Sequence, residues 1–158
     1  HPNNTKRVLR ALEVYRATGL TISQQEALSH AEESDIEPLY IGITYINREN
    51  LYNRINRRVD IMLENGLLHE ATEVYASDVS TTAIASIGCK EMKPYLDGEK
   101  SLEECVEKLK MSTRRYAKRQ LTWFRRNENI NWVYPDTCSQ QELYDYVDKL
   151  IINYLEGE

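Results

Sequence analysis

Long apolar runs, repeats and paired cysteines are missing from this sequence. No stretch of its 158 residues approaches the roughly 20 consecutive apolar residues that a membrane helix needs, and no secretory signal peptide is present. Cys89, Cys105 and Cys138 are an odd number at wide spacing without a C-x-x-C pair, which argues against a disulfide framework and a zinc site. We therefore expect a cytoplasmic protein with reduced thiols, no membrane association and no metal ligands of its own.

The remaining composition is that of one globular region. With 41% hydrophobic and 28% charged residues, the chain is large enough for one core, so we treat residues 1–158 as a single region. The chain begins with His1, and its opening residues lead straight into an amphipathic pattern. This indicates that the chain starts inside a larger protein.

Hydrophobic periodicity predicts a mostly helical α/β structure with two short strands. The strands are expected at 38–45 and 130–134, where β-branched and aromatic residues cluster. Helices are expected at 5–18, from 47 to about 66, and at 67–77, 102–125 and 142–155. The last helix should place five apolar side chains inside: Leu143, Val147, Leu150, Ile151 and Tyr154. The polar, acidic stretch 23–37 predicts a loop or linker with a short helix.

Basic residues gather in one segment, although the net charge of the chain is −5. This segment has no Asp or Glu and eight cations: Lys108, Lys110, Arg114, Arg115, Lys118, Arg119, Arg125 and Arg126. Since like charges four residues apart repel, such a helix favours an anionic partner, and the interleaved Tyr116, Trp123 and Phe124 suit base stacking. The alternative is a solvated helix face with ordinary core aromatics.

Two arginines lie four residues apart in the helix expected after residue 47. Arg54 and Arg58 share one face and flank the apolar stripe, whereas Arg57 projects away from it. The stripe consists of Leu51, Ile55, Val59 and Met62. Arginines at such an edge can reach into a cleft and grip phosphate oxygens with both arms of the guanidinium. The alternative is a structural arginine paired with an acid of a neighbouring element.

A turn at Ser86-Ile87-Gly88-Cys89-Lys90-Glu91 opens a further expected helix. Its glycine and the lysine in the first helical turn can present backbone N–H groups and a positive charge to an anion. On its own such a turn is most often an ordinary helix entry.

Together these segments resemble the tRNA dimethylallyltransferase family, in the order in which the family has them. The resemblance covers nearly the entire chain, through residues 1–13, 51–58, 87–88, 95–99 and 113–125. Two runs within it are specific: Arg10-Ala-Leu-Glu and Ala117-Lys-Arg-Gln-Leu-Thr-Trp-Phe-Arg.

The resemblance implies a P-loop-type, nucleoside-kinase-like α/β fold of which this chain is the carboxyl-terminal part. The implied activity transfers a dimethylallyl group from dimethylallyl diphosphate, with Mg²⁺, to N6 of adenosine 37 in tRNAs that read codons beginning with U. The adenine of the anticodon stem-loop is flipped into a channel where the two substrates meet. We expect a monomer that binds Mg²⁺ mainly through the family's amino-terminal part.

The resemblance also implies roles for individual residues. Arg58 matches the catalytic arginine that binds and neutralises the diphosphate. Beside the resemblance, we expect Arg54 to support that site or to pack against it. Three segments match the tRNA-contacting parts of the family: Lys6, Arg7, Val8, Leu9 and Arg10; Ala85, Ser86, Ile87, Gly88, Cys89 and Lys90; and Lys118, Arg119, Gln120, Leu121, Thr122, Trp123, Phe124 and Arg125.

The chain also departs from the family. The family's phosphate loop, the Asp that accepts the N6 proton and a Gly-Gly-Thr segment belong upstream of His1, so we expect the chain to be inactive alone. Ala85 stands where many relatives carry a long polar side chain, and Cys89 stands where an aromatic is usual. These changes favour contacts of the backbone or of Lys90 with phosphate over direct reading of a base.

Two other kinds of protein remain as alternatives. The basic helix and the missing phosphate loop also suit a non-enzymatic helical RNA-binding module, and a helical scaffold for acidic proteins would have no preference for tRNA over another polyanion. A transferase should place Arg58 in the same cavity as Gly88 and the basic helix, whereas a binding module gains nothing from Arg58 at a cleft edge.

Overall fold

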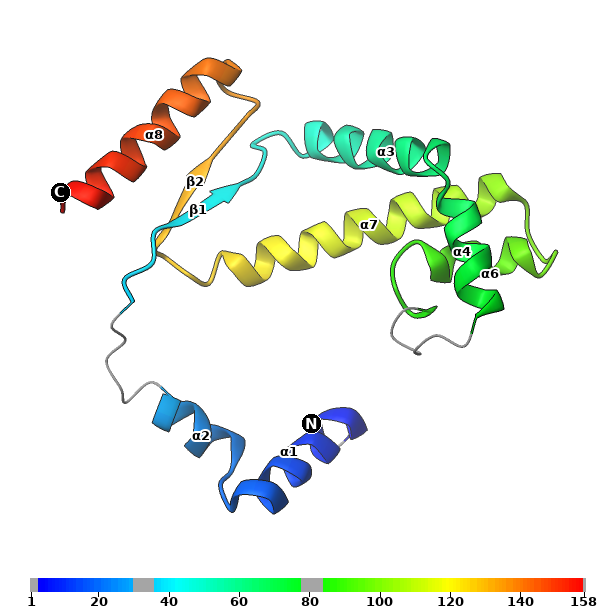
Figure 1. Ribbon diagram of the computed structural model, residues 1–158, viewed down its shortest axis with the longest axis horizontal. Helices are drawn as coiled ribbons and strands as arrows, with labels where there is room; N and C mark the ends of the chain where they lie inside the picture. Colours follow the sequence, from blue (N-terminus) through cyan, green and yellow to red (C-terminus); the bar gives the residue numbers. More distant parts are fainter. Residues whose placement is uncertain (1–2, 30–35, 78–83, 158) are drawn as a thin grey trace. The chain divides into compact units, whose positions relative to one another are not determined.

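A computed structural model of the chain describes residues 3–29, 36–77 and 84–157. Helices dominate, and the chain divides into two compact units, His1–Pro38 and Leu39–Glu158 (Figure 1). Among the described residues, no helix combines the length and the apolar character that a membrane span requires.

The smaller unit contains helices α1 (Thr5–Thr18) and α2 (Ile22–Ser29). The side chain of Asn4 accepts a hydrogen bond from the backbone N–H of Arg7 at the start of α1, and Gly19 ends the helix at φ 72°. Only glycine adopts this left-handed conformation without steric cost, so the predicted end of α1 is confirmed. Helix α2 occupies the first part of the predicted linker 23–37, of which residues 30–35 lie outside the described ranges.

The larger unit contains the two predicted strands, β1 (Tyr40–Ile43) and β2 (Ile130–Val133), each shorter than expected. They pair in parallel, with Tyr40 opposite Ile130 and Ile43 opposite Val133. The hydrogen-bonding pattern continues one residue beyond β1, where the backbone N–H of Thr44 donates to the carbonyl of Val133 over 3.1 Å. Parallel strands need a long connection, which the helices between β1 and β2 provide.

Five helices of the larger unit match the predicted positions: α3 (Arg48–Glu64), α4 (Leu67–Ala76), α6 (Cys89–Leu96), α7 (Leu102–Phe124) and α8 (Gln140–Glu156). Helix α3 begins after Asn47, whose side chain accepts a hydrogen bond from the N–H of Glu49. Helix α7 begins with the predicted capping box, in which Ser101 and Glu104 satisfy each other's backbone N–H groups.

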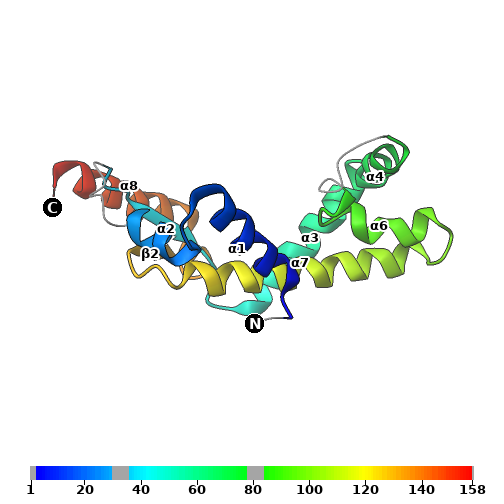
Figure 2. The ribbon, with the colours of Figure 1, turned by 90° about the horizontal axis from the view of Figure 1, so that it is seen from below.

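The core lies where α3, α4, α6 and α7 meet. Helix α6 packs against both α4 and α7 and lies between them in Figure 2. The buried cluster consists of Val59, Leu67, Ala71, Cys89, Met92, Cys105 and Leu109. Two of the three free thiols therefore act as small core residues.

The expected burial of α8 is wrong. None of its side chains is buried; Leu143, Val147 and Leu150 are half-buried, while Ile151 and Tyr154 are exposed. Within the described part of the larger unit no helix packs closely against α8, so the periodicity that predicted the helix correctly did not predict its burial.

Candidate functional site

Arg54 and Arg58 line one hollow of about 630 Å³ beside α3. Both residues are exposed, and the walls also include Asn53, Ile61 and Tyr45. Apolar burial of Ile55 and Val59 fixes the rotation of α3, so the two arginines face away from the core along one edge. The predicted groove with two accessible guanidinium groups is therefore present.

Arg57 lines the same hollow, which the helical periodicity did not predict. Arg57 is exposed and lies three residues after Arg54, close enough on the helix surface for its long side chain to line the same hollow. Among the described residues, none of the three arginines forms an ion pair with an acid. Three guanidinium groups around one hollow, unpaired among the described residues, offer the charge and the hydrogen-bond donors that an anion needs.

Two cations of the basic segment hold α7 against α3. Lys110 lies 2.8 Å from the carboxylate of Asp60, and its side chain is only 16% exposed. The hydrogen bond with Asp60 raises the pKa of Lys110, against the opposing effect of desolvation. Arg114 donates a 2.6 Å hydrogen bond to Oδ1 of Asn56. The expectation of eight uncompensated charges is therefore wrong for Lys110, because its acids lie outside the basic segment.

The other six cations of the segment are exposed to solvent. Arg119 lies 5.7 Å from the centroid of the Tyr116 ring, and Trp123 is 65% exposed. Trp123 meets Phe124 edge to face at 5.3 Å. Aromatic side chains that belonged to an ordinary core would not be exposed beside unpaired cations. Base stacking, in contrast, requires exposed rings.

Two hollows of about 250 Å³ each border this end of α7. One is lined by four residues of α7 and by Arg126 just after it: Lys118, Arg119, Thr122, Trp123 and Arg126. The other lies between α7 and the start of α3 and contains Arg48, Lys118 and Arg125. Neither shares Arg58 or Gly88, so the expected single cavity for Arg58, Gly88 and the basic helix is not found in the described residues.

The turn before α6 is only partly accessible. The N–H of Gly88 donates to the buried carboxylate of Glu91 over 3.1 Å, and Cys89 belongs to the core. Gly88 has φ 115°, which favours glycine, and a side chain there would also approach Leu67. The exposed members of the turn are Ala85, Ser86, Ile87 and Lys90.

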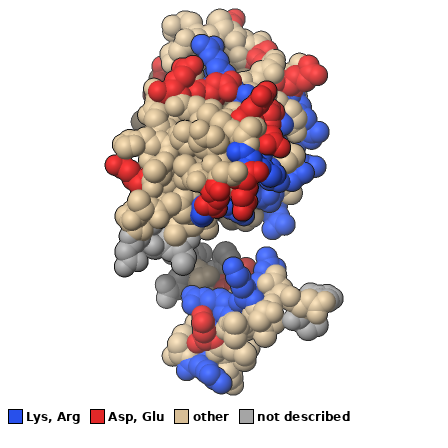
Figure 3. All heavy atoms as spheres, turned by 90° about the vertical axis from the view of Figure 1, so that its right-hand side faces the viewer, with Lys and Arg blue, Asp and Glu red and all other residues tan. Residues whose placement is uncertain are grey.

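The third predicted segment, Lys6 to Arg10, lies on α1 and is exposed throughout. Arg10 pairs with Glu13 over 3.5 Å, at high exposure of both side chains. Figure 3 shows blue Lys and Arg side chains prominent on the smaller unit, whereas blue and red mix on the visible face of the larger one.

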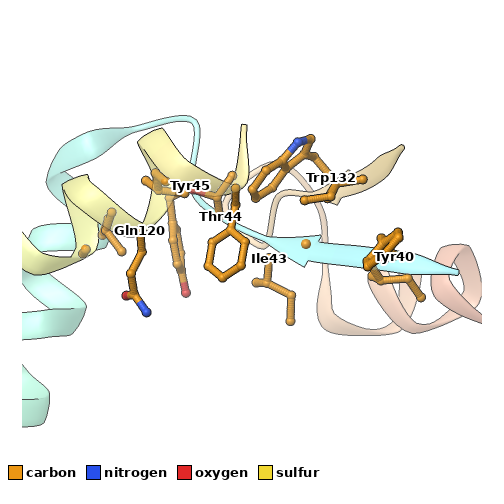
Figure 4. Close-up of a pocket in the computed structure, with 13 residues that line it drawn as sticks. Tyr40, Ile43, Thr44, Tyr45, Gln120 and Trp132 are labelled. Carbon is orange, nitrogen blue, oxygen red and sulfur yellow. The ribbon is translucent and has the colours of Figure 1, made fainter. Parts of the chain in front are cut away.

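An apolar cavity of about 380 Å³ lies between the sheet and the end of α7. Figure 4 shows Trp132, Tyr45 and Gln120 around it, with Thr44 at the end of β1. The Thr44 hydroxyl is buried and has no hydrogen-bond partner in the described residues. Buried hydroxyls are normally paired, so the Thr44 hydroxyl is an exception among the described residues.

Sequence reasoning missed Arg48, Arg57 and Tyr45, which line these hollows. The position of Arg48 in the sequence could have indicated a function. A cation in the first turn of a helix interacts unfavourably with the helix dipole, so its presence there calls for a separate explanation. Tyr45 borders three of the hollows and had no such signal.

Comparison with known proteins identifies the family of the chain. The sequence model of a family described as IPP transferase matches residues 1–127. A tRNA dimethylallyltransferase of Caldanaerobacter subterraneus is 42% identical over the whole chain, and one of Acetivibrio thermocellus is 50% identical over 90% of it. The chain spans 50% and 46% of these two relatives.

Solved structures agree as well. The crystal structure of a tRNA delta(2)-isopentenylpyrophosphate transferase from Staphylococcus epidermidis matches 97% of the chain with a TM-score of 0.69 and 42% identity. The full-length tRNA isopentenylpyrophosphate transferase of Bacillus halodurans matches all of it with a TM-score of 0.66 and 40% identity. The chain covers 50% of each of these structures. With most of its length matched by the family's sequence model, the chain belongs to the IPP transferase family.

Proposed function

We propose that this chain contributes the diphosphate-binding arginines and much of the tRNA-binding surface to a tRNA dimethylallyltransferase. The observation that carries the proposal is the hollow beside α3, where Arg54, Arg57 and Arg58 are exposed and without an acidic partner among the described residues. A diphosphate supplies the negative charge that such a hollow lacks.

The proposed reaction joins N6 of adenosine 37 of the tRNA to the allylic C1 of dimethylallyl diphosphate. As the C1–O bond breaks, negative charge develops on the departing diphosphate, and Arg58 stabilises that charge while Arg54 supports it. A group outside this chain accepts the proton that N6 loses. Each group that supplies such a step is worth about two to four orders of magnitude in rate.

For tRNA we propose contacts from three places: Lys6 to Arg10 on α1, the turn before α6, and Lys118 to Arg125 on α7. In the turn, the accessible Ala85, Ser86, Ile87 and Lys90 make the contacts, since Cys89 lies in the core. On α7, exposed cations reach phosphates and Trp123 offers a stacking surface.

The sheet of this chain joins a larger α/β sheet in the complete enzyme. In support, purely parallel sheets are ordinarily covered on both faces, whereas this one has two strands and borders an apolar cavity. The family also implies Mg²⁺, which would assist the departing diphosphate. No three His, Cys, Asp or Glu side chains of the described chain lie together as metal ligands, so no residue here is assigned to the ion and no step depends on it.

Prenyl transfer to an unmodified anticodon stem-loop tests the proposal. The chain alone should show no turnover, and the same chain joined to the other half of the family's fold should be active. In that complete enzyme Arg58→Ala should lower kcat roughly 10²- to 10³-fold, and Arg58→Lys should recover little, because an ammonium cannot make the two-armed contact. Lys149→Ala, an exposed cation of α8, is the control for lost charge. Turnover by the chain alone, or full activity of Arg58→Ala, would show that the chemistry lies on other residues.

A further inference from the structure

Arg48 lies at the first position of α3, where a positive charge is unfavourable. The amino-terminal end of a helix carries partial positive charge, so acids are preferred there. Asp136 supplies the acid, since its carboxylate accepts hydrogen bonds from the N–H groups of Ile46 and Asn47 and from the side chain of Asn50. The helix start is thus already satisfied, and Arg48 is not needed there.

The side chain of Arg48 is directed by an aromatic ring instead. Its guanidinium carbon lies 6.0 Å from the centroid of the Tyr52 ring, one helical turn further along α3. Arg114 of α7 lies 5.8 Å from the same centroid. Tyr52 therefore has a cation from each helix near its ring, and Arg114 is held in place by its bond to Asn56.

This ring forms part of the hollow of about 250 Å³ between α3 and α7. From the end of α7 the hollow receives Lys118 and the C-cap residue Arg125, which are seven residues apart; because Arg125 keeps a helical backbone conformation, the two lie on one face. All three cations of the hollow, Arg48, Lys118 and Arg125, are exposed. Among the described residues none of them pairs with an acid, although Lys110 on the same helix does. Asp136 and Glu49, the acids at the start of α3, do not line the hollow.

We propose that Arg48 is a tRNA-binding residue and that it holds, together with Lys118 and Arg125, one backbone phosphate of the RNA in this hollow. This inference rests on the proposed tRNA-binding role of α7 and extends it to α3. Three converging cations from two helices fit a phosphate, which offers oxygens in several directions, and Arg48 can contact two of them at once. The site would fix the RNA on the same helix that carries Arg58.

A double-mutant cycle with an unmodified anticodon stem-loop RNA tests the shared phosphate, using the full chain and several salt concentrations. Arg48→Ala and Lys118→Ala should each lower affinity about tenfold and make its salt dependence shallower. Together they should cost less than the product of the two losses, because both side chains hold the same group. Arg48→Lys should keep most of the salt dependence, since the charge remains. Circular dichroism checks that each variant retains its helices.

Controls separate this site from its neighbours. The effects of Lys149→Ala and Arg48→Ala on RNA affinity should multiply fully in the double variant. Arg48→Ala should leave the affinity for inorganic diphosphate unchanged, whereas Arg58→Ala should lower it. If Arg48→Ala binds RNA normally and Lys118→Ala does not, the proposed phosphate site in the hollow is wrong, but the proposed role of α7 stands. If neither variant weakens binding, the proposed tRNA surface on α7 fails as well. The proposal of a shared RNA phosphate would be overturned if the losses of RNA affinity in Arg48→Ala and Lys118→Ala multiplied in the double variant. A loss of diphosphate affinity in Arg48→Ala would overturn it as well.

Discussion

Arg114 of α7 donates a 2.6 Å hydrogen bond to Oδ1 of Asn56 on α3, 58 residues earlier in the chain. Together with the pair of Lys110 and Asp60, this bond joins the basic helix to the helix that carries Arg54 and Arg58. The cations of α7 thus have two uses, one in holding the fold and one at the surface.

The first prediction concerns the stability of that connection. Arg114→Ala should lower the free energy of unfolding by about 1.5–3 kcal/mol, the range for a hydrogen bond to a charged group, because Asn56 loses its half-buried partner. Urea denaturation of Arg114→Ala, Asn56→Ala and the double variant would show the coupling. Arg115→Ala, the exposed neighbour, should change stability by no more than about 0.5 kcal/mol. Equal effects at both positions would contradict a specific role for Arg114.

A second prediction distinguishes charge from stacking on α7. Arg119→Ala should reduce the salt dependence of tRNA affinity by about one unit of slope, whereas Trp123→Ala should cost about 1–3 kcal/mol with little change in slope. Lys110→Met is the matched control, because its charge is already paired with Asp60 and should not contribute to the slope. Coinciding slopes for wild type and Arg119→Ala would mean that the exposed face of α7 is only solvated.

A third prediction concerns pH. Desolvation tends to raise the pKa of Asp136, but its hydrogen bonds from Asn47, Ile46 and Asn50 outweigh this and lower it. A carboxyl whose pKa is lower in the folded chain stabilises the fold above its unfolded pKa of about 3.9, and that stabilisation is lost as the pH falls through the folded pKa.

Urea midpoints of wild type and Asp136→Asn from neutral pH down to strongly acidic pH would test this. The advantage of wild type should be full near neutrality and shrink in acid. Comparison with the variant removes the contributions of Glu104 and Glu142, whose pKa values are also lowered by hydrogen bonds from Ser101 and Ser139. An advantage that stays constant down to the most acidic pH would contradict the role of the Asp136 carboxylate.

The fourth prediction is steric. A Cβ atom at Gly42 would lie 2.6 Å from Cγ2 of Ile130 and 2.8 Å from the ring of Trp132. Gly42→Ala should therefore force the two strands apart and destabilise the larger unit by about 1–3 kcal/mol. Gly98→Ala is a useful comparison, since a side chain there meets nothing within 4 Å. Its only cost is the backbone strain of an alanine at φ 74°. Thermal unfolding of both variants would separate the two effects, and unchanged stability of Gly42→Ala would refute the close contact.

Local signals in the sequence determined where most elements begin and end. Asn47, Ser101 and Gly19 are capping residues whose chemistry acts within a few positions, so the limits of α1, α3 and α7 could be predicted from them. The face shared by Arg54 and Arg58 followed from the period of the helix for the same reason. The family, too, could be recognised from the motifs along the chain.

What only the tertiary structure decided were the relations between distant segments. The pairing of Lys110 with Asp60, the carboxylate of Asp136 at the start of α3, and the meeting of Arg48 with Lys118 all depend on which elements pack together. The exposure of Ile151 on α8 depends on it as well, since periodicity shows which face is apolar but not whether a neighbour covers it. Burial and charge pairing are properties of the packed chain, and the sequence pattern of one helix contains no information about its partner.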